Sequence, residues 1–263
     1  MLGKLLKYDL KWIYKPLIIF YIIAIVFACI GRGLNEIQNS LVLNIIGKVC
    51  NGVVISMIIN IIINNFMRVW ARFIRNIYKD ESYLTHTLPV EKNKIYLSKI
   101  LSSIITLFTS SIVILLCVCI CYYSKETLEF IKTSLELVAT TYDSTVQGFL
   151  AVVFIVIVLE AIFGILAGIL GIIIGHKSNS MKLIKSIIIG FAIYMVTSLL
   201  SLVVMLVVGL FNPEIMNLFN TVNAIDVDAI KTILYIGVVL YTIYILAYYF
   251  IGKKLLYKGV DVD

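Results

Sequence analysis

The sequence predicts an all-α, multi-pass membrane protein with six transmembrane helices. Hydrophobic residues make up 61% of the 263 residues, and the mean hydropathy is +1.04. A soluble domain with a polar surface does not have this composition. Long apolar segments recur along the chain, and most charged residues lie between them. We therefore interpret residues 1–263 as one membrane-embedded domain.

Six segments match the length that a membrane crossing requires, which is roughly 20 apolar residues for about 30 Å of hydrocarbon. The first is short, because only sixteen residues separate Lys15 from Arg32, so its ends depend on snorkelling side chains. No clear small-residue cleavage site follows Ile30, so we expect this segment to stay as a span instead of being removed as a signal peptide. The expected spans are 16–32, 42–67, 100–123, 148–174, 186–211 and 232–252.

The basic residues predict the orientation of the chain, because Lys and Arg near span ends stay on the cytoplasmic side. Seventeen of the twenty-two basic residues lie in the N-terminal segment, in 68–99, around 177–185 or after the last span. Both termini are therefore expected in the cytoplasm. The net charge of +7 follows from this bias, so it does not indicate a nucleic-acid partner.

Residues 1–15 have the pattern of an amphipathic helix that lies in the membrane interface. Lysines recur every three or four residues on one face, and leucines and Ile13 occupy the other. Each lysine near an anionic surface contributes roughly 1 kcal/mol to membrane binding. Asp9 falls on the apolar face, so it either has a basic partner in the protein or lies near the water line. The interfacial lysines are Lys4, Lys7, Lys11 and Lys15.

The segment 68–99 is the one long hydrophilic stretch between two strongly apolar ones. Basic residues recur in its first part at helical spacing, which predicts that the second span continues as an amphipathic helix. This extension either anchors the chain at the membrane or also supports the residues that follow. A short helix fits between Asp80, a candidate N-cap, and Leu88, which Pro89 forces out of the helical region. The expected membrane contacts are Arg68, Arg72 and Arg75.

The sequence KDESYLTHTLP at 79–89, followed by a helix that includes Ser98 and Lys99, resembles the first cytoplasmic loop of type-2 ATP-binding-cassette (ABC) permeases. The similarity is to the branch that handles peptides and peptide antibiotics. In that family the short segment is a coupling helix, which docks into a groove on a cytoplasmic ATPase. The pattern departs from the family at Ser82, where glycine is common, and at Glu91, where a hydroxyl residue often caps the next helix. By this resemblance, the ATPase contacts are Asp80, Glu81, Tyr83, Leu84, Thr87, Leu88 and Pro89.

The resemblance implies the membrane subunit of an ATP-driven exporter in a bacterial plasma membrane. The sequence contains no nucleotide-binding motif, catalytic triad or metal-ligand cluster, so ATP and Mg would bind to a separate ATPase and no cofactor to this chain. The implied assembly holds two ATPase copies and two permeases, the second being identical or a sister chain. Its implied substrate is an amphipathic peptide, such as a toxin of the phenol-soluble modulin type, or a peptide antibiotic.

Glu160 is the one clear charged residue inside an expected span, where a carboxylate costs roughly 2.5 to 3.5 kcal/mol unless it is paired or protonated. It is either functional or the partner of Lys48 in a structural salt bridge. An alternative to the exporter is a secondary transporter that uses Glu160 as a proton-linked carboxylate. Other polar residues of the spans either line a transport pathway or form hydrogen bonds between helices. Those with a candidate pathway role are Asn60, Asn64, Tyr241 and Tyr244.

Two further patterns concern packing and the outer face. Small residues at spacings of three and four in the fourth span, which are Gly164, Gly168, Gly171 and Gly175, predict close helix packing. The outer segment 123–148 has apolar residues at helical spacing among charges, which predicts an extracellular amphipathic helix that receives substrate, forms a lid or anchors the chain. The outer segment 211–231 corresponds in the resembled family to short helices that close the exit.

Overall fold

The computed structural model describes residues 1–37, 41–124, 129–130, 132–136, 145–178, 180–211 and 227–257. All regular secondary structure among these residues is helical. Six helices are long and apolar enough to cross a membrane, which confirms the predicted number of spanning segments and supports a multi-pass membrane protein. The helices belong to two compact units, Met1–Phe130 and Ile131–Asp263.

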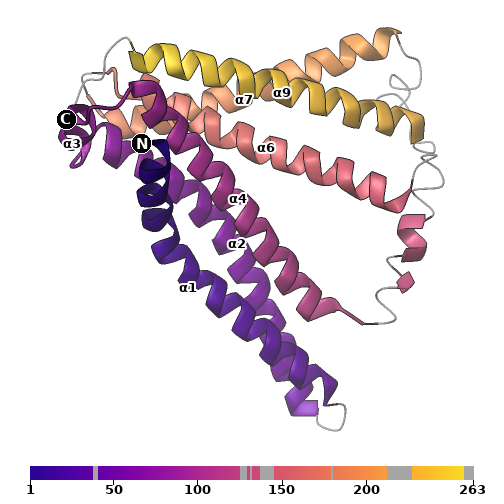
Figure 1. Cartoon of the computed structure of the whole chain (residues 1–263). Helices are drawn as coiled ribbons and strands as arrows, with labels where there is room; N and C mark the ends of the chain where they lie inside the picture. The colour runs from indigo at the N-terminus through magenta and orange to yellow at the C-terminus, as the bar shows by residue number, and fades with distance from the viewer. Residues whose placement is uncertain are drawn as a thin grey trace. The chain divides into compact units, whose positions relative to one another are not determined.

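The long described segments of the first unit form α1 (Leu2–Glu36), α2 (Leu41–Ile77), the short α3 (Ser82–Thr87) and α4 (Lys92–Tyr122). Figure 1 shows α1, α2 and α4 side by side, with the short α3 at the end where α1 begins. The second span does continue as a helix into the hydrophilic segment, since α2 extends to Ile77. α3 and the first turns of α4 therefore lie beside the N-terminal part of α1.

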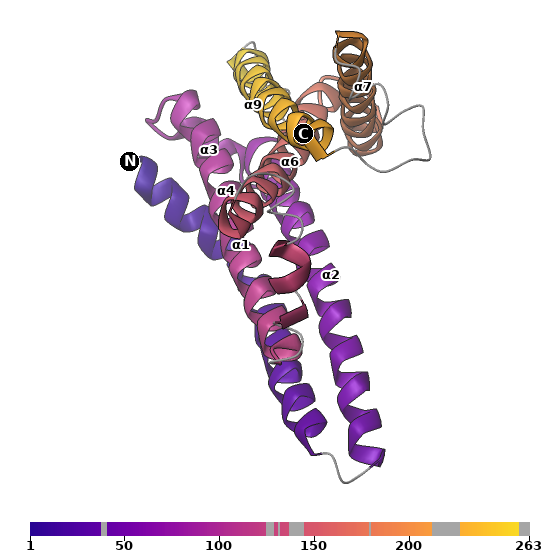
Figure 2. The same ribbon diagram turned by 90° about the vertical axis from the view of Figure 1, so that its right-hand side faces the viewer.

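The structure differs from the sequence prediction at the N-terminus, because the predicted interfacial helix and first span form one helix, α1. Pro16 lies inside this helix. Proline lacks the N–H that would bond to the carbonyl one turn earlier, which favours a bend at this position. The axis of α1 changes direction in its N-terminal half (Figure 2). The four interfacial lysines are all exposed, and their contact with a membrane surface stays a prediction.

One stripe of α1 forms much of the core of the first unit. Its members recur every three or four residues, as expected for a single helix face, and are Ile13, Leu17, Tyr21, Ala24 and Ala28. Hydroxyl groups connect this stripe to α4, since the Tyr21 hydroxyl lies 2.7 Å from Ser110 Oγ. Such hydrogen bonds between helices are favourable in hydrocarbon, where water does not compete for the polar groups.

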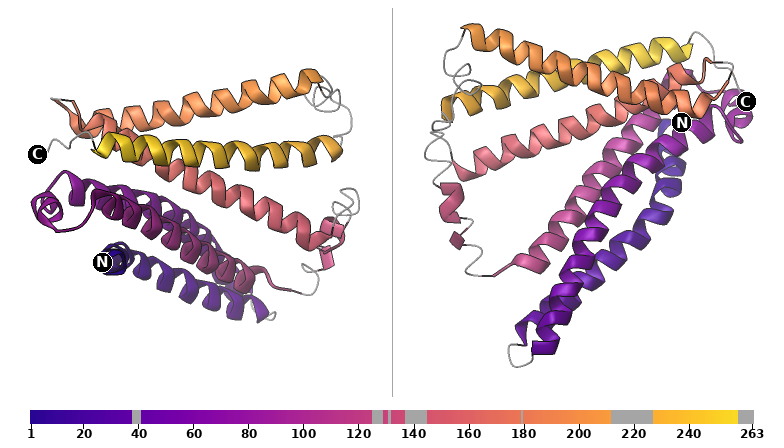
Figure 3. Two further views of the ribbon diagram at one scale, coloured as in Figure 1. Left: turned by 45° about the horizontal axis from the view of Figure 1, so that its top comes forward. Right: turned by 180° about the vertical axis from the view of Figure 1, so that it is seen from behind.

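The second unit contains α6 (Val146–Gly175), α7 (Lys182–Phe211) and α9 (Val227–Tyr257). α6 packs against both α7 and α9 (Figure 3). The predicted role of the glycines is confirmed where α6 meets α7. A Cβ atom on Gly171 would overlap the backbone of Gly190, and one on Gly175 would lie 2.5 Å from the Cα atom of Ser186. These two helices approach so closely that only hydrogen fits at the contact.

The predictions for the outer face fall largely outside the described residues. Of the apolar positions in the expected outer helix, Leu128, Ile131 and Val138 are not described, whereas Leu135 lies in a helical stretch at 132–136. Lys132 and Glu136 form an ion pair of 3.7 Å on that stretch. In the last outer segment, residues 212–226 lie outside the described part of the chain.

Candidate functional site

A buried charged cluster lies where α1, α2 and α4 meet. Asp9 is only 2% exposed, and its Oδ1 atom accepts from Arg72 Nε at 2.9 Å and from Lys99 Nζ at 2.5 Å. Its other oxygen, Oδ2, accepts from Ser98 Oγ at 2.8 Å. Asp9 therefore has basic partners in the protein, which decides between the two interpretations that its place on the apolar face left open.

The cluster satisfies the condition for burying charge, because removing an ion from water costs several kcal/mol unless paired groups and hydrogen bonds replace the water. Trp12, one turn after Asp9, contributes an aromatic face. The guanidinium carbon of Arg72 lies 5.6 Å from the centre of its ring, and that of Arg68 lies 5.8 Å away. Attraction between cation and ring stabilises the arginines at this distance. The cluster thus fixes α1 to α2 and α4.

Arg72 also connects this cluster to α3. Its Nη1 atom donates to Glu81 Oε2 at 2.6 Å, and Asn76 Nδ2 donates to the same oxygen at 3.1 Å. Arg75 Nε lies 3.3 Å from the other oxygen, Glu81 Oε1. Glu81 is the residue immediately before α3, so a continuous chain of charged contacts runs from Asp9 through Arg72 to the start of this helix.

α3 is shorter than the sequence predicted, and Glu81, not Asp80, occupies the N-cap position. Asp80 instead lies 3.6 Å from Arg75 in an exposed ion pair. Within the helix, Thr85 Oγ1 donates to the Glu81 carbonyl at 2.8 Å. The predicted end is confirmed, because Leu88 has extended backbone angles, φ −62° and ψ 136°, directly before Pro89.

The two sides of α3 differ sharply in exposure. Ser82 and Thr85 are buried against the first unit. On the other side, Tyr83 is 77% exposed, Leu84 67% and Leu88 43%. Thr87 and Pro89 are exposed as well, so five of the seven predicted ATPase contacts form one outward face, which we call the α3 face: Tyr83, Leu84, Thr87, Leu88 and Pro89.

Two residues, Glu81 and Arg72, take different positions from those that the sequence suggested. Glu81 is turned inward, with its side chain 30% exposed and bound by Arg72, Arg75 and Asn76. Arg72, an expected membrane contact, is buried in the charged cluster, because Asp9 and Glu81 attract it from either side. Arg75 stays exposed, and Arg68 is partly covered beside Trp12. The extension of α2 therefore supports α3, whichever membrane contact it also makes.

The polar residues of α2 separate into two groups. Asn60 and Asn64, both candidate pathway residues, donate to backbone carbonyls one turn earlier, those of Ser56 and Asn60. Asn65 is buried, at 1% exposure, and bonds to α4: its Nδ2 atom lies 2.9 Å from the Thr106 carbonyl and 2.6 Å from Ser110 Oγ. Asn65 thus joins two helices, and the role of Asn60 and Asn64 in a pathway stays a prediction.

We expect Asn65→Leu to lower the free energy of unfolding by about 1 kcal/mol, up to about 2 kcal/mol, because hydrogen bonds between membrane helices contribute on this scale. Asn60→Leu is the matched control on the same helix, since its side chain bonds only within α2, and it should change stability little. Reversible unfolding in mixed detergent micelles measures both variants. Equal losses for the two variants would contradict a specific role of Asn65.

Glu160 lies in a second polar group, inside the second unit. It is exposed, and its Oε1 atom accepts from the Tyr194 hydroxyl at 3.5 Å, the outer limit of a hydrogen bond. Tyr241 on α9 interacts electrostatically with the same carboxylate. The expected salt bridge with Lys48 would join the two units and stays a prediction.

Phe163, one turn after Glu160, contacts a group of tyrosine rings. It is fully buried, and four tyrosine rings have their centres 5.5 to 5.8 Å from its own. Tyr248 is stacked on it and donates to Thr197 Oγ1 at 3.1 Å, and Tyr244 accepts from Ser201 Oγ at 3.2 Å. Tyr248 therefore packs within the second unit, and Tyr244, a candidate pathway residue, is buried as well.

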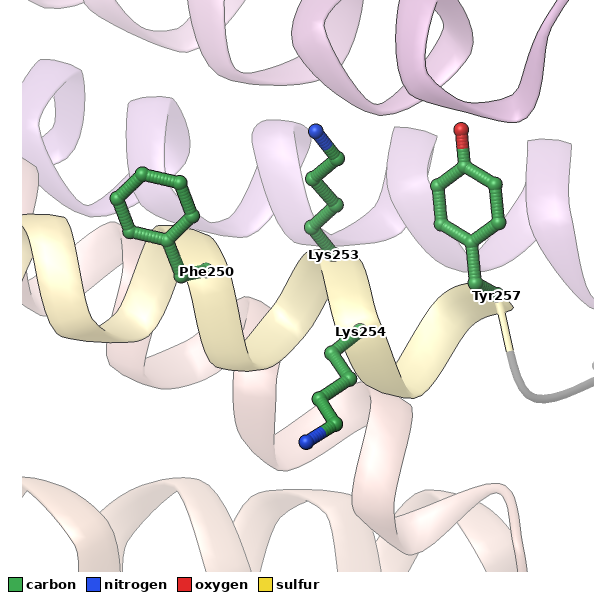
Figure 4. A pocket seen from close by; sticks show the side chains of 4 residues that line it. All are labelled: Phe250, Lys253, Lys254 and Tyr257. Carbon is green, nitrogen blue, oxygen red and sulfur yellow. The ribbon is translucent and has the colours of Figure 1, made fainter.

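The last turns of α9 form a basic end of the second unit. Phe250, Lys253 and Tyr257 lie along one side of the helix, and Lys254 points to the other (Figure 4). They line a surface depression that is open, and the four side chains come from a single helix. The cytoplasmic position of the C-terminus, which was predicted partly from these basic residues, stays a prediction.

Several residues of these sites could not be recognised in the sequence. Lys99 was expected at the cytoplasmic end of a span, with no partner named, and nothing distinguished Asn65 from its neighbours. The place of Asp9 on an apolar helix face was a usable signal, since it left a basic partner as one of two interpretations, although it did not identify that partner. Phe163 and Tyr194 carried no signal, because aromatic residues are common throughout the spans.

Fold and site together define a helical, multi-pass membrane protein. In it, a buried charged cluster holds α3, the short helix of the hydrophilic segment 68–99. Comparison with protein-family models, with curated proteins and with solved structures finds no match for this chain. Its candidate functions therefore follow from its own residues and their geometry.

Proposed function

We propose that this protein is the membrane-spanning permease subunit of an ATP-driven exporter of the ABC type, and that α3 docks on a separate cytoplasmic ATPase. The observation that supports this most directly is the α3 face. A six-residue helix cannot be stable by itself, yet this helix and its C-cap residue expose a tyrosine and two leucines. Exposed apolar side chains grouped in this way are typical of a protein interface.

The support beneath α3 suits a coupling element. A docking helix transmits movement only if it is attached to the parts that must move, and Glu81 attaches α3 to Arg72, which in turn binds Asp9 and, through it, Lys99. Force on the α3 face would therefore act on α1, α2 and α4 together. ATP binding to the ATPase would shift the balance between two arrangements of the spans only if the contacts at α3 differ between them.

The remaining parts of the proposal concern the assembly. A six-span chain encloses half of a pathway, so we propose a second permease, either identical or a sister chain, and two ATPase copies that bind ATP and Mg. The substrate proposed is an amphipathic peptide or a peptide antibiotic, which partitions into the bilayer and meets the apolar surfaces of the spans. The plasma membrane is the proposed location, with both termini in the cytoplasm.

Glu160 supports the second candidate function, a secondary transporter without an ATPase. An exposed carboxylate within a span is a typical proton-carrying group. In that case substrate flux would follow a proton gradient and would not change with ATP, whereas the α3 face would have no partner. Transport measured in proteoliposomes with either driving force separates the two functions.

The exporter proposal predicts that Leu84→Ala with Leu88→Ala weakens ATPase binding at least tenfold, because burying a leucine side chain contributes roughly 1.5 to 3 kcal/mol and a loss of about 1.4 kcal/mol is a factor of ten. The measurement is association between the full chain in lipid nanodiscs and a co-expressed candidate ABC ATPase, together with the stimulation of ATP hydrolysis. Met181→Ala is the matched control, since it removes an equally exposed apolar side chain from the connection between α6 and α7.

Binding that survives in the double variant would contradict docking through α3. If no ATPase associates with the unaltered chain, the exporter proposal fails as a whole, and proton-driven transport through Glu160 becomes the function to test.

A further inference from the structure

The site around Glu160 has a property that the exporter proposal does not use. Glu160 lies on α6, a helix long and apolar enough to span a membrane. Its side chain is exposed on the surface of that helix. Among the described residues of the second unit, no Lys, Arg or His forms an ion pair with it. The Tyr194 hydroxyl, at 3.5 Å, is a weak partner for a full negative charge. This carboxylate is therefore suited to a cation that comes from outside the unit.

Aromatic rings complete the site. Tyr194 and Tyr241 are half-buried and interact electrostatically with Glu160 from α7 and α9. Tyrosine faces attract cations, most strongly where water is excluded. The rings are held in place by contacts with Phe163, at 5.5 Å and 5.6 Å between ring centres. Three helices thus contribute one carboxylate and two partly open rings, and both rings contact Phe163, one turn after Glu160.

We propose that Glu160, Tyr194 and Tyr241 form a binding site for a cationic group, an ammonium or a guanidinium, on an amphipathic ligand inside the membrane. Glu160 supplies the opposite charge, and the two rings cover the cation from the sides. The apolar part of the ligand lies along the exposed apolar residues that flank the site on α6 and α7, including Ile157 and Phe191. A neutral or acidic amphipathic ligand gains nothing from this carboxylate, so the site selects by charge.

Within the exporter proposal, this site would make cationic amphipathic peptides the preferred substrate class, and that part of the inference rests on the proposed function. The binding site itself does not depend on an ATPase. The test therefore uses the full chain alone in nanodiscs of zwitterionic lipid, where no anionic lipid competes for the probe. A failure of α3 docking leaves its outcome unchanged, and a failure here leaves α3 docking unaffected.

The probes are two fluorescent amphipathic peptides of about 20 residues, one with lysines on its polar face and one with glutamines at the same positions. The lysine peptide is expected to bind the unaltered chain more tightly than the glutamine peptide. Glu160→Gln should weaken the lysine peptide about tenfold and leave the glutamine peptide unchanged. The unchanged glutamine affinity also shows that this variant is folded.

Two further variants define the site. Tyr194→Phe keeps the ring and removes the hydroxyl, so it should retain most of the lysine-peptide affinity, whereas Tyr194→Leu should lose several-fold. Glu91→Gln is the control for net charge, because it removes an exposed carboxylate from the cytoplasmic segment, and it should have no effect. Equal affinity for the two peptides in the unaltered chain, or equal weakening of both by Glu160→Gln, would overturn the proposal.

A structural pair between Glu160 and Lys48 is the competing assignment. Thermal unfolding of Glu160→Gln, Lys48→Gln and the double variant separates the two. Losses of stability that are strongly non-additive would assign Lys48 as the partner and overturn the proposal, and independent, additive effects would support an unpaired carboxylate that receives its cation from the ligand.

Discussion

Asp9→Ala is expected to lower the free energy of unfolding by about 3 to 5 kcal/mol, because it leaves buried Arg72 and Lys99 without their shared counter-charge. The loss arises less from the missing attraction than from two cations that stay out of water unpaired. Reversible unfolding of the full chain in mixed micelles measures it. Asp80→Asn is the matched control, since its carboxylate is exposed and its ion pair with Arg75 should contribute only about 0 to 1 kcal/mol.

A second substitution tests the cause of this loss. Lys99→Met added to Asp9→Asn removes one buried cation together with the anion and leaves Arg72 paired with Glu81. The double variant should therefore be more stable than Asp9→Asn alone, a non-additive result that is typical of buried ion pairs. If Lys99→Met instead adds its own loss in full, the cluster does not act as a unit and its role as the base of α3 is refuted.

The second large effect concerns the contact between α6 and α7. Gly171→Ala should destabilise the second unit by about 1 to 3 kcal/mol, because its new methyl group would overlap the backbone of Gly190 and force the helices apart. Gly237→Ala on α9 is the matched control, since a Cβ atom there meets no other atom within 4 Å. Alanine favours helix over glycine by up to about 1 kcal/mol at both positions, so the difference between the variants reports the overlap.

Thermal unfolding of the full chain in detergent compares these two variants. Equal stability would show that α6 and α7 separate without cost, and would remove the basis for the close packing described here. A loss of stability confined to Gly171→Ala would support the close contact. The added methyl group would also crowd the Ser186 carbonyl near the start of α7.

The two proposals concern sites that lie in different units of the protein. Charged contacts attach α3 to the core of the first unit, whereas the carboxylate at Glu160 lies in a different unit with aromatic neighbours. The first is internally paired and suits transmission of force. The second lacks a strong partner among the described residues of its unit and suits binding. This division separates the residues expected to affect coupling from those expected to affect ligand selection.

Composition and spacing determined much of the fold in advance. Long apolar segments are sufficient to predict spanning helices, because in hydrocarbon every backbone polar group must bond within its own helix. The same holds for the extension of α2, predicted from basic residues at helical spacing, and for the end of α3 at Leu88, which follows from the local geometry of Pro89. Each of these features depends on residues close together in the sequence.

Tertiary structure alone decided which polar groups meet. Glu81 and Leu88 were assigned to one surface, yet Arg72 and Asn76 draw Glu81 inward, and only the position of α2 shows this. Asn64 and Asn65 are neighbours with the same chemistry, but a rotation of about 100° per residue turns only Asn65 toward α4. Asp9 required a cation, and the packing of α1 against α2 and α4 identified Arg72 and Lys99. Helices form from local sequence, whereas their partners are set by contacts between residues up to 95 positions apart.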